Sequence, residues 1–127
     1  MKLICAGVGK TGSKTCSAAL RELGYSVGDS LETIESLGPI WVEYIEGKVT
    51  IQDVIAEYDK HGFDANQDLP GNLLWEDLYN AMGSKTGNET KVILTIRDSD
   101  EKWFQSFYNF SEQEMRRHAI GDFNVQG

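Results

Sequence analysis

A glycine-rich stretch near the N-terminus, residues 7–15, constrains the fold more than any other part of this chain. It overlaps the end of an apolar run, residues 2–8, which is too short for a helix and typical of a buried strand. It leads into residues 16–23, which carry apolar side chains at helical spacing and end at Gly24. A strand, a glycine loop and a helix in this order can bind phosphate, because loop amides and the positive helix N-terminus attract anions.

The spacing of the glycines leaves three kinds of phosphate loop open. A P-loop nucleotide kinase or hydrolase needs two glycines separated as Gly7 and Gly12 are. Ser13 then stands where the lysine belongs, and Lys14 comes one residue late. One helical residue corresponds to a rotation of about 100°, which turns that lysine away from the phosphates. This first possibility predicts magnesium-dependent binding of ATP.

The second possibility is a Rossmann-type domain that binds NAD(P). Its Gly-x-Gly-x-x-Gly pattern is matched literally by Gly7, Gly9 and Gly12. Asp29 lies near the distance expected for the acid that binds the ribose. This possibility predicts that Asp29 contacts ribose and that Arg97 has no ligand role.

The third possibility takes residues 10–15, Lys-Thr-Gly-Ser-Lys-Thr, as one block. Lys10 stands before the helix and can reach forward to a bridging phosphate oxygen. The following amides and hydroxyls can surround the terminal group of the ligand, and they belong to Thr11, Gly12, Ser13, Lys14 and Thr15. A glycine turn that only connects the strand to the helix is the simplest structural alternative.

The rest of the chain alternates short apolar segments with segments of helical period. Further strands are predicted at residues 25–27, at the start of 63–70 and at 91–96. Helices are predicted from Ser30 to Ile45 with a break or kink at Gly38-Pro39, over 51–61, over 71–82 with Leu73, Leu74, Leu78 and Tyr79 inward, and from Ser99 through Phe110. The alternation predicts an α/β fold of three layers, α/β/α, around a short and mostly parallel sheet. The unbroken apolar run 91–96 predicts a central strand covered on both faces.

Composition narrows the function classes. A net charge of −8 on 127 residues argues against a general nucleic-acid or membrane-surface binder. Cys5 and Cys16 have no metal-ligand spacing and are expected to be buried or half-buried thiols in a reducing compartment. The apolar run at the N-terminus is too short for a signal peptide, and no segment reaches membrane-spanning length. We expect one cytoplasmic domain, residues 1–127, without a metal site and in an oligomeric state that the sequence leaves open.

A second motif follows the run 91–96. Residues 94–98 read Leu-Thr-Ile-Arg-Asp, with Trp103 and Ser106 in the next predicted helix. Ligands of open α/β sheets bind beyond the carboxyl ends of the strands, so Arg97 is expected at the same edge as the glycine loop. The two motifs together resemble the P-loop sulfotransferases, the cytosolic sulfotransferase-like proteins with an Arg-Asp-x-x-x-x-Trp second signature. The similarity runs from about Lys2 to about Phe110.

The resemblance implies transfer of a sulfuryl group from 3′-phosphoadenosine-5′-phosphosulfate (PAPS) to a hydroxyl or amine of a small molecule, without a metal. Lys10 would be the main donor to the leaving 5′-phosphate, with residues 11–15 as its cradle. Arg97 and Ser106 would hold the 3′-phosphate. Asp68-Leu69-Pro70 stands where many members have His-Leu-Pro, so Asp68 is the candidate base, and a helix cap is its structural alternative.

The chain departs from the family pattern in three places. Gly9 stands where a proline usually precedes the lysine, and Ser99 stands where a proline usually follows the Arg-Asp pair. The interval from Arg97 to Ser106 is one residue longer than usual. Family members usually continue with a late basic loop over the 3′-phosphate, so the resemblance implies a C-terminally truncated domain whose activity stays open. Residues 120–127 have little pattern, and their order stays open too.

Overall fold

The structure is a computed structural model that describes residues 1–29, 32–83 and 89–119. It comprises two compact units, the first ending at Ile96 and the second beginning at Arg97. The strands are β1 (Leu3–Cys5), β2 (Val27–Asp29), β3 (Ala65–Gln67) and β4 (Lys91–Ile93), and the helices are α1 (Ser13–Glu22), α2 (Ile34–Ile45), α3 (Ile51–Lys60), α4 (Trp75–Gly83) and α5 (Asp100–Ala119). The α/β class is therefore confirmed, and the single domain over residues 1–127 stays a prediction.

The four strands form one parallel sheet in the order β2-β3-β1-β4. In register, Ile4 of β1 lies between Asn66 of β3 and Val92 of β4. Because all four strands run in the same direction, their carboxyl ends lie at one edge of the sheet. The segments that follow the strands, including the glycine loop after β1, therefore begin at that edge.

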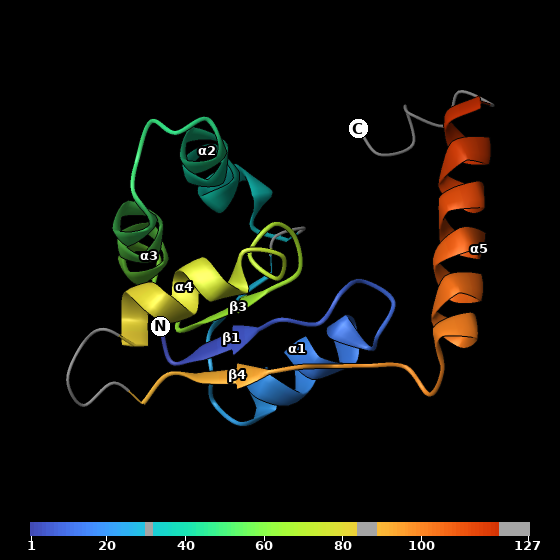
Figure 1. The fold of residues 1–127 in the computed structure, drawn as a ribbon, viewed down its shortest axis with the longest axis horizontal. Coiled ribbons are helices and arrows are strands. Elements are labelled where there is room, and N and C mark those ends of the chain that lie inside the picture. Colours follow the sequence, from blue (N-terminus) through green and yellow to red (C-terminus); the bar gives the residue numbers. More distant parts are fainter. Residues whose placement is uncertain (30–31, 84–88, 120–127) are drawn as a thin grey trace. The chain divides into compact units, whose positions relative to one another are not determined.

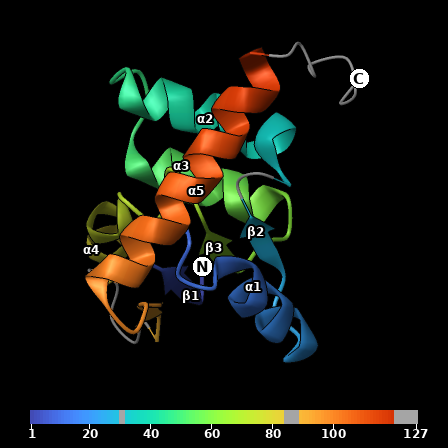
Figure 2. The same ribbon diagram turned by 90° about the vertical axis from the view of Figure 1, so that its right-hand side faces the viewer.

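Helices cover both faces of the sheet in Figures 1 and 2, and an apolar cluster lies on each face. On one face Ile4 packs in a cluster with residues of α2, α3 and α4, including Trp41, Tyr58 and Leu78. On the other face Leu3 and Cys5 pack with Leu20 of α1. This alternation along β1 follows from the period of two in a strand. The first unit thus has the predicted three layers.

Local sequence signals account for several helix ends. Thr50 and Asp53 form a capping box at the start of α3, as predicted for Thr50. Gly24 and Gly62 follow α1 and α3 with left-handed backbones, at φ 94° and 76°. Helix α2 continues through Pro39, so of the predicted break or kink at Gly38-Pro39 the break is wrong, and a kink stays a prediction. The predicted start of this helix at Ser30 lies outside the described residues.

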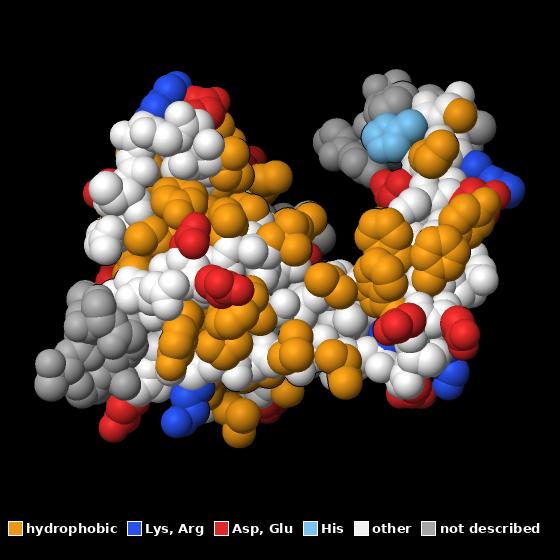
Figure 3. Space-filling view, viewed as in Figure 1, with side chains coloured by type: hydrophobic (Ala, Val, Ile, Leu, Met, Phe, Trp, Pro, Cys, Tyr) orange, Lys and Arg blue, Asp and Glu red, His pale blue; other side chains and the backbone are white. Residues whose placement is uncertain are grey.

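Strand β4 contradicts the prediction of a central strand. It is an edge strand of three residues, and the chain beyond it leaves Leu94 67% and Ile96 74% exposed. Hydrophobic side chains accordingly lie on the surface of the first unit in Figure 3. A continuous apolar run shows that a strand can be covered on both faces, but the pairing of the other strands decides its place in the sheet.

Helix α4 begins later than predicted. Residues 71–74 form turns, because Asn72 N–H donates to the Asp68 carbonyl and Asn72 Nδ2 donates to the Gly7 carbonyl. Leu78 points inward as predicted, and Leu74 is partly buried. Leu73 and Tyr79 are exposed, so their predicted inward positions are wrong.

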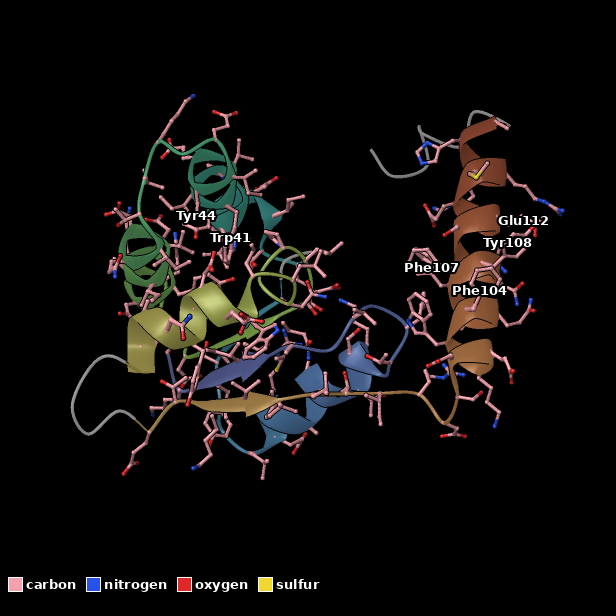
Figure 4. The ribbon with its side chains drawn as sticks, in the orientation of Figure 1. Trp41, Tyr44, Phe104, Phe107, Tyr108 and Glu112 are labelled. Atoms are coloured by element: carbon pink, nitrogen blue, oxygen red, sulfur yellow. The ribbon has the colours of Figure 1, made fainter. Side chains whose placement is uncertain are left out.

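Figure 4 shows aromatic side chains of each unit. Trp41 and Tyr44 project from α2, where Trp41 Nε1 donates to the Tyr58 hydroxyl and the Tyr44 hydroxyl donates to Asp77. In the second unit, Phe104 and Tyr108 stack one helical turn apart on α5. The two hydrogen bonds of the first unit join α2 to α3 and to α4. The stacked rings of the second unit lie along one side of α5.

The second unit confirms the predicted helix start. Ser99 Oγ accepts a hydrogen bond from Lys102 N–H, and Asp100 and Glu101 occupy the first turn of α5. Acidic groups there interact favourably with the positive end of the helix. None of the helices that the structure describes is both long enough and apolar enough to cross a membrane.

Candidate functional site: a phosphate loop

The glycine loop, residues 7–12, connects β1 to α1 at the carboxyl edge of the sheet. Gly12 is the N-cap of α1 with φ 87°, and Lys10 has φ 66°. Both angles lie in the left-handed region, which glycine adopts freely and lysine only at a cost. No side chain caps α1, in contrast to the capping box of α3. The first-turn amides of α1 are therefore suited to an anion.

The buried Thr11 hydroxyl ties the glycine loop to the chain that leaves β4. It donates to the Val8 carbonyl, and it lies 2.7 Å from the Thr95 hydroxyl. Because the single proton of Thr11 is directed to Val8, the Thr95 hydroxyl donates to Thr11. Ala6 N–H adds a bond of 2.8 Å to the Ile93 carbonyl. The glycine loop therefore contacts the first residues of the second motif, 94–96, within the first unit.

Buried amide side chains at the end of β3 hold the same loop from another direction. Gln67 Nε2 donates to the Ser13 carbonyl at 3.2 Å, and Asn72 Nδ2 donates to the Gly7 carbonyl at 3.1 Å. Asn66 Oδ1 accepts from Cys5 N–H at 3.1 Å. These three residues and Thr95 received no role from sequence reasoning. The available signal was the placement of two consecutive amides, Asn-Gln, in a buried strand.

Lys14 pairs with the carboxylate that ends β2. The Lys14 Nζ lies 3.0 Å from Asp29 Oδ2 and 3.7 Å from Glu32 Oε1. Ser17 Oγ lies 3.4 Å from the same Asp29 oxygen. Partial burial lowers the pKa of Lys14, but its hydrogen bond to Asp29 and the nearby acidic charges raise that pKa above its ordinary value. The Lys14 ammonium is thus already paired with the carboxylates of Asp29 and Glu32.

This ion pair bears on the two alternatives to a sulfotransferase loop. The Asp29 carboxylate is fully buried, so it has no exposed surface for a ribose. The Lys14 ammonium faces Asp29, which is not the position that a triphosphate-binding lysine requires. The burial of Asp29 disfavours a dinucleotide-binding domain, and the position of Lys14 disfavours a P-loop kinase or hydrolase.

Asp68 follows β3 with a left-handed backbone, at φ 70°. Its Oδ1 accepts from Leu69 N–H at 3.1 Å, and its negative charge acts on Lys14. Since α4 begins at Trp75, Asp68 is not the cap of that helix, so the predicted cap is wrong. The Asp68 carboxylate instead stabilises the turn that precedes α4. Its role as a base stays a prediction.

The predicted site residues divide between the two units. The first unit brings together Lys10, Thr11, Gly12, Ser13, Lys14, Thr15 and Asp68. Arg97 opens the second unit, and Ser106 lies in α5. The roles of these residues toward a ligand stay predictions. No group of three or more histidine, cysteine or acidic side chains that could hold a metal occurs within residues 1–29, 32–83 and 89–119.

A parallel sheet with a glycine loop and an uncapped helix at its carboxyl edge defines an α/β protein with a loop whose geometry suits an anion. The model of the sulfotransferase domain family matches residues 2–123 of this chain. The chain therefore belongs to the sulfotransferase family, as the resemblance predicted. A comparison with curated proteins gave no match.

The ion pair between Lys14 and Asp29 leads to a stability prediction. Replacing Asp29 with Asn is expected to lower the free energy of unfolding by about 1–2 kcal/mol at neutral pH, a modest value because Lys14 is 56% exposed and screened by water. The raised pKa of Lys14 means that this contribution is present below its ordinary pKa of 10.5 and is lost as the pH rises through the folded-state value. Urea denaturation should therefore show the difference shrinking at alkaline pH.

The matched control for this measurement is Glu32→Gln, which removes an exposed carboxylate from the same lysine. It should change the stability by less than about 0.5 kcal/mol. Equal stabilities of wild type and Asp29→Asn at neutral pH would contradict the prediction.

Proposed function

We propose that this chain binds PAPS and transfers its sulfuryl group to a hydroxyl or amine of a small molecule. The observation that carries the proposal is the hydrogen bond between Thr11 and Thr95. It joins the glycine loop to residues 94–96, the part of the second sulfotransferase-like motif that lies in the first unit. Membership of the sulfotransferase family supports the same class of reaction.

The residues around the glycine loop fit a ligand with a terminal phosphate. The Gly12 backbone and the first turn of α1 offer amides that no side chain caps. Lys10 adds a cation next to them, and Ser13 and Thr15 add hydroxyls in the same turn. The nearest buried carboxylate, Asp29, is neutralised by Lys14 and so does not repel an anion at the loop.

Each side chain in the proposal has a distinct role. Lys10 donates to the 5′-phosphate, where negative charge grows as the sulfuryl group leaves, and fixed donors at that place lower the barrier. Arg97 and Ser106 bind the 3′-phosphate, which ATP lacks. Asp68 accepts the proton of the acceptor hydroxyl. PAPS supplies the sulfuryl group when it is bound.

A comparison of three ligands tests this proposal. Adenosine 3′,5′-bisphosphate, at a hundred times its dissociation constant, is expected to stabilise the fold by about 2.7 kcal/mol with or without magnesium. Thermal unfolding of the full chain measures the effect, with ATP and NAD as the comparison ligands. Stabilisation by ATP that needs magnesium would instead support a kinase or hydrolase. Stabilisation by NAD alone would support a dinucleotide-binding domain.

A further inference from the structure

Two cysteines flank the glycine loop and pack in the same apolar layer between β1 and α1. Cys5 is the last residue of β1, and Cys16 lies in the first turn of α1. Cys5 is part of the apolar cluster between β1 and α1, and Cys16 packs against that same cluster. Neither thiol has a role in the proposed binding of phosphate.

The fold directs both side chains into the same layer. Cys5 points to the α1 face of the sheet, where it packs with Leu3 and Leu20. Cys16 lies one helical turn before Leu20, so it shares the face of α1 that covers the sheet, and it packs against the same cluster. The backbone holds both ends, since Cys5 N–H donates to Asn66 and Cys16 N–H donates to Gly12. The proximity of the thiols is therefore a property of the strand-loop-helix arrangement.

We propose that Cys5 and Cys16 form a reversible disulfide, with a hydroperoxide as the oxidant, which closes residues 6–15 into a covalent ring and weakens the binding of a phosphorylated ligand at the loop. The weakened binding of the ligand rests on the proposed function. The disulfide itself does not, because it follows from the positions of the two thiols.

Exposure and acidity assign an order to the reaction. Cys5 is 1% exposed, and burial together with the neighbouring thiol raises its pKa to about 12. Cys16 is partly exposed, so it is the thiol that meets the oxidant. The thiolate is the reactive form, and the buried partner then resolves the oxidised sulfur.

The two steps balance as follows. The Cys16 thiol gives up its proton, its sulfur attacks one oxygen of hydrogen peroxide and the O–O bond breaks, which leaves a sulfenic acid and one water. The Cys5 sulfur then attacks the Cys16 sulfur and the S–O bond breaks. The departing hydroxide takes the Cys5 proton and leaves as a second water. The two thiols lose two electrons in total, and the peroxide is reduced by two electrons.

The new bond is expected to disturb the loop. Bonded sulfurs lie about 2.05 Å apart, whereas non-bonded atoms stay about 3.5 Å apart or more. Pairing with β3 and β4 fixes the end of β1. The first turn of α1 must therefore move toward β1 to bring the two sulfurs to bonding distance. That turn carries the amides of Ser13 and Lys14, and a shift on the order of 1 Å is enough to spoil a binding geometry.

The test begins with the reduced full chain and hydrogen peroxide. Intact mass spectrometry should show a monomer that has lost two hydrogens, and a non-reducing tryptic digest should link peptide 3–10 to peptide 15–21. Retention of both thiols, or a disulfide between two chains, would overturn the proposal. Cys16→Ser, a change at a partly exposed position, and Cys5→Ala should each prevent the linked peptide.

The second readout is calorimetric binding of adenosine 3′,5′-bisphosphate. Oxidised wild type should bind at least tenfold more weakly than reduced wild type, and dithiothreitol should restore the affinity. Reduced and peroxide-treated Cys16→Ser should bind alike. An unchanged dissociation constant in the disulfide-linked chain would overturn the proposed control of binding. A reduced wild type that does not bind would count against the proposed function, while the mass measurement still decides the disulfide.

Discussion

Replacing Lys10 with glycine is expected to weaken the binding of adenosine 3′,5′-bisphosphate by about 10- to 100-fold while leaving the fold as stable as the wild type or more stable. A hydrogen bond from a charged donor contributes about 1.5–3 kcal/mol, which corresponds to that range of affinity. Lys10 has φ 66°, so glycine also relieves a strain of about 1 kcal/mol. Opposite effects on binding and stability would identify Lys10 as a residue kept for its ligand.

Lys10→Ala is the matched variant, because it removes the same ammonium group and retains the left-handed residue with a Cβ. Calorimetric titration should give both variants the same loss of affinity, and urea denaturation should rank Lys10→Gly as the more stable. Lys48→Ala, which removes an exposed lysine paired with Glu46, serves as the control for net charge. If Lys10→Gly and wild type bound equally well, the assignment of the phosphate donor would be wrong.

Replacing Gly7 with alanine is expected to destabilise the fold by about 3 kcal/mol and to disrupt the glycine loop. A Cβ at Gly7 would lie 2.0 Å from Thr95 Oγ1, 2.9 Å from the Thr95 carbonyl oxygen and 3.0 Å from the Thr95 nitrogen. The hydroxyl can rotate away, but that rotation breaks its bond to Thr11. The two backbone atoms can give way only if the chain beyond β4 moves.

Gly9→Ala provides the control within the same loop. A Cβ at Gly9 meets no atom within 4 Å, so this variant should differ from wild type by less than about 0.5 kcal/mol. Combining Gly7→Ala with Thr95→Ala should recover only part of the lost stability, since the backbone contacts remain. Urea denaturation measures all three variants, and equal midpoints for Gly7→Ala and Gly9→Ala would refute the close contact.

Several features were predictable because a few neighbouring residues decide them. The capping box needs only Thr50 and Asp53, which lie within one turn of each other. The left-handed backbone at Gly24 needs only a residue without a Cβ. The same holds for Gly12, so the position of the glycine loop could be found from the sequence. The family could be found as well, because its two motifs are short and continuous.

Other features depended on contacts between distant segments. An apolar strand suits the centre of a sheet as well as its edge, and among the strands that the structure describes β4 pairs with β1 alone. The amides of Gln67 and Asn72 could have had many partners, and only the folded chain directs them to the carbonyls of Ser13 and Gly7. Sequence spacing could not anticipate these bonds.

The order of strand, loop and helix, the glycine positions and the family follow from local pattern, since backbone preferences act over a few residues. The partners of Lys14, Cys16 and Thr11 do not, because each lies on a segment that only packing brings near. A side chain at a given position can form an ion pair, a thiol pair or a ligand contact. The sheet and helix α1 select among these, since they determine which groups come within bonding distance.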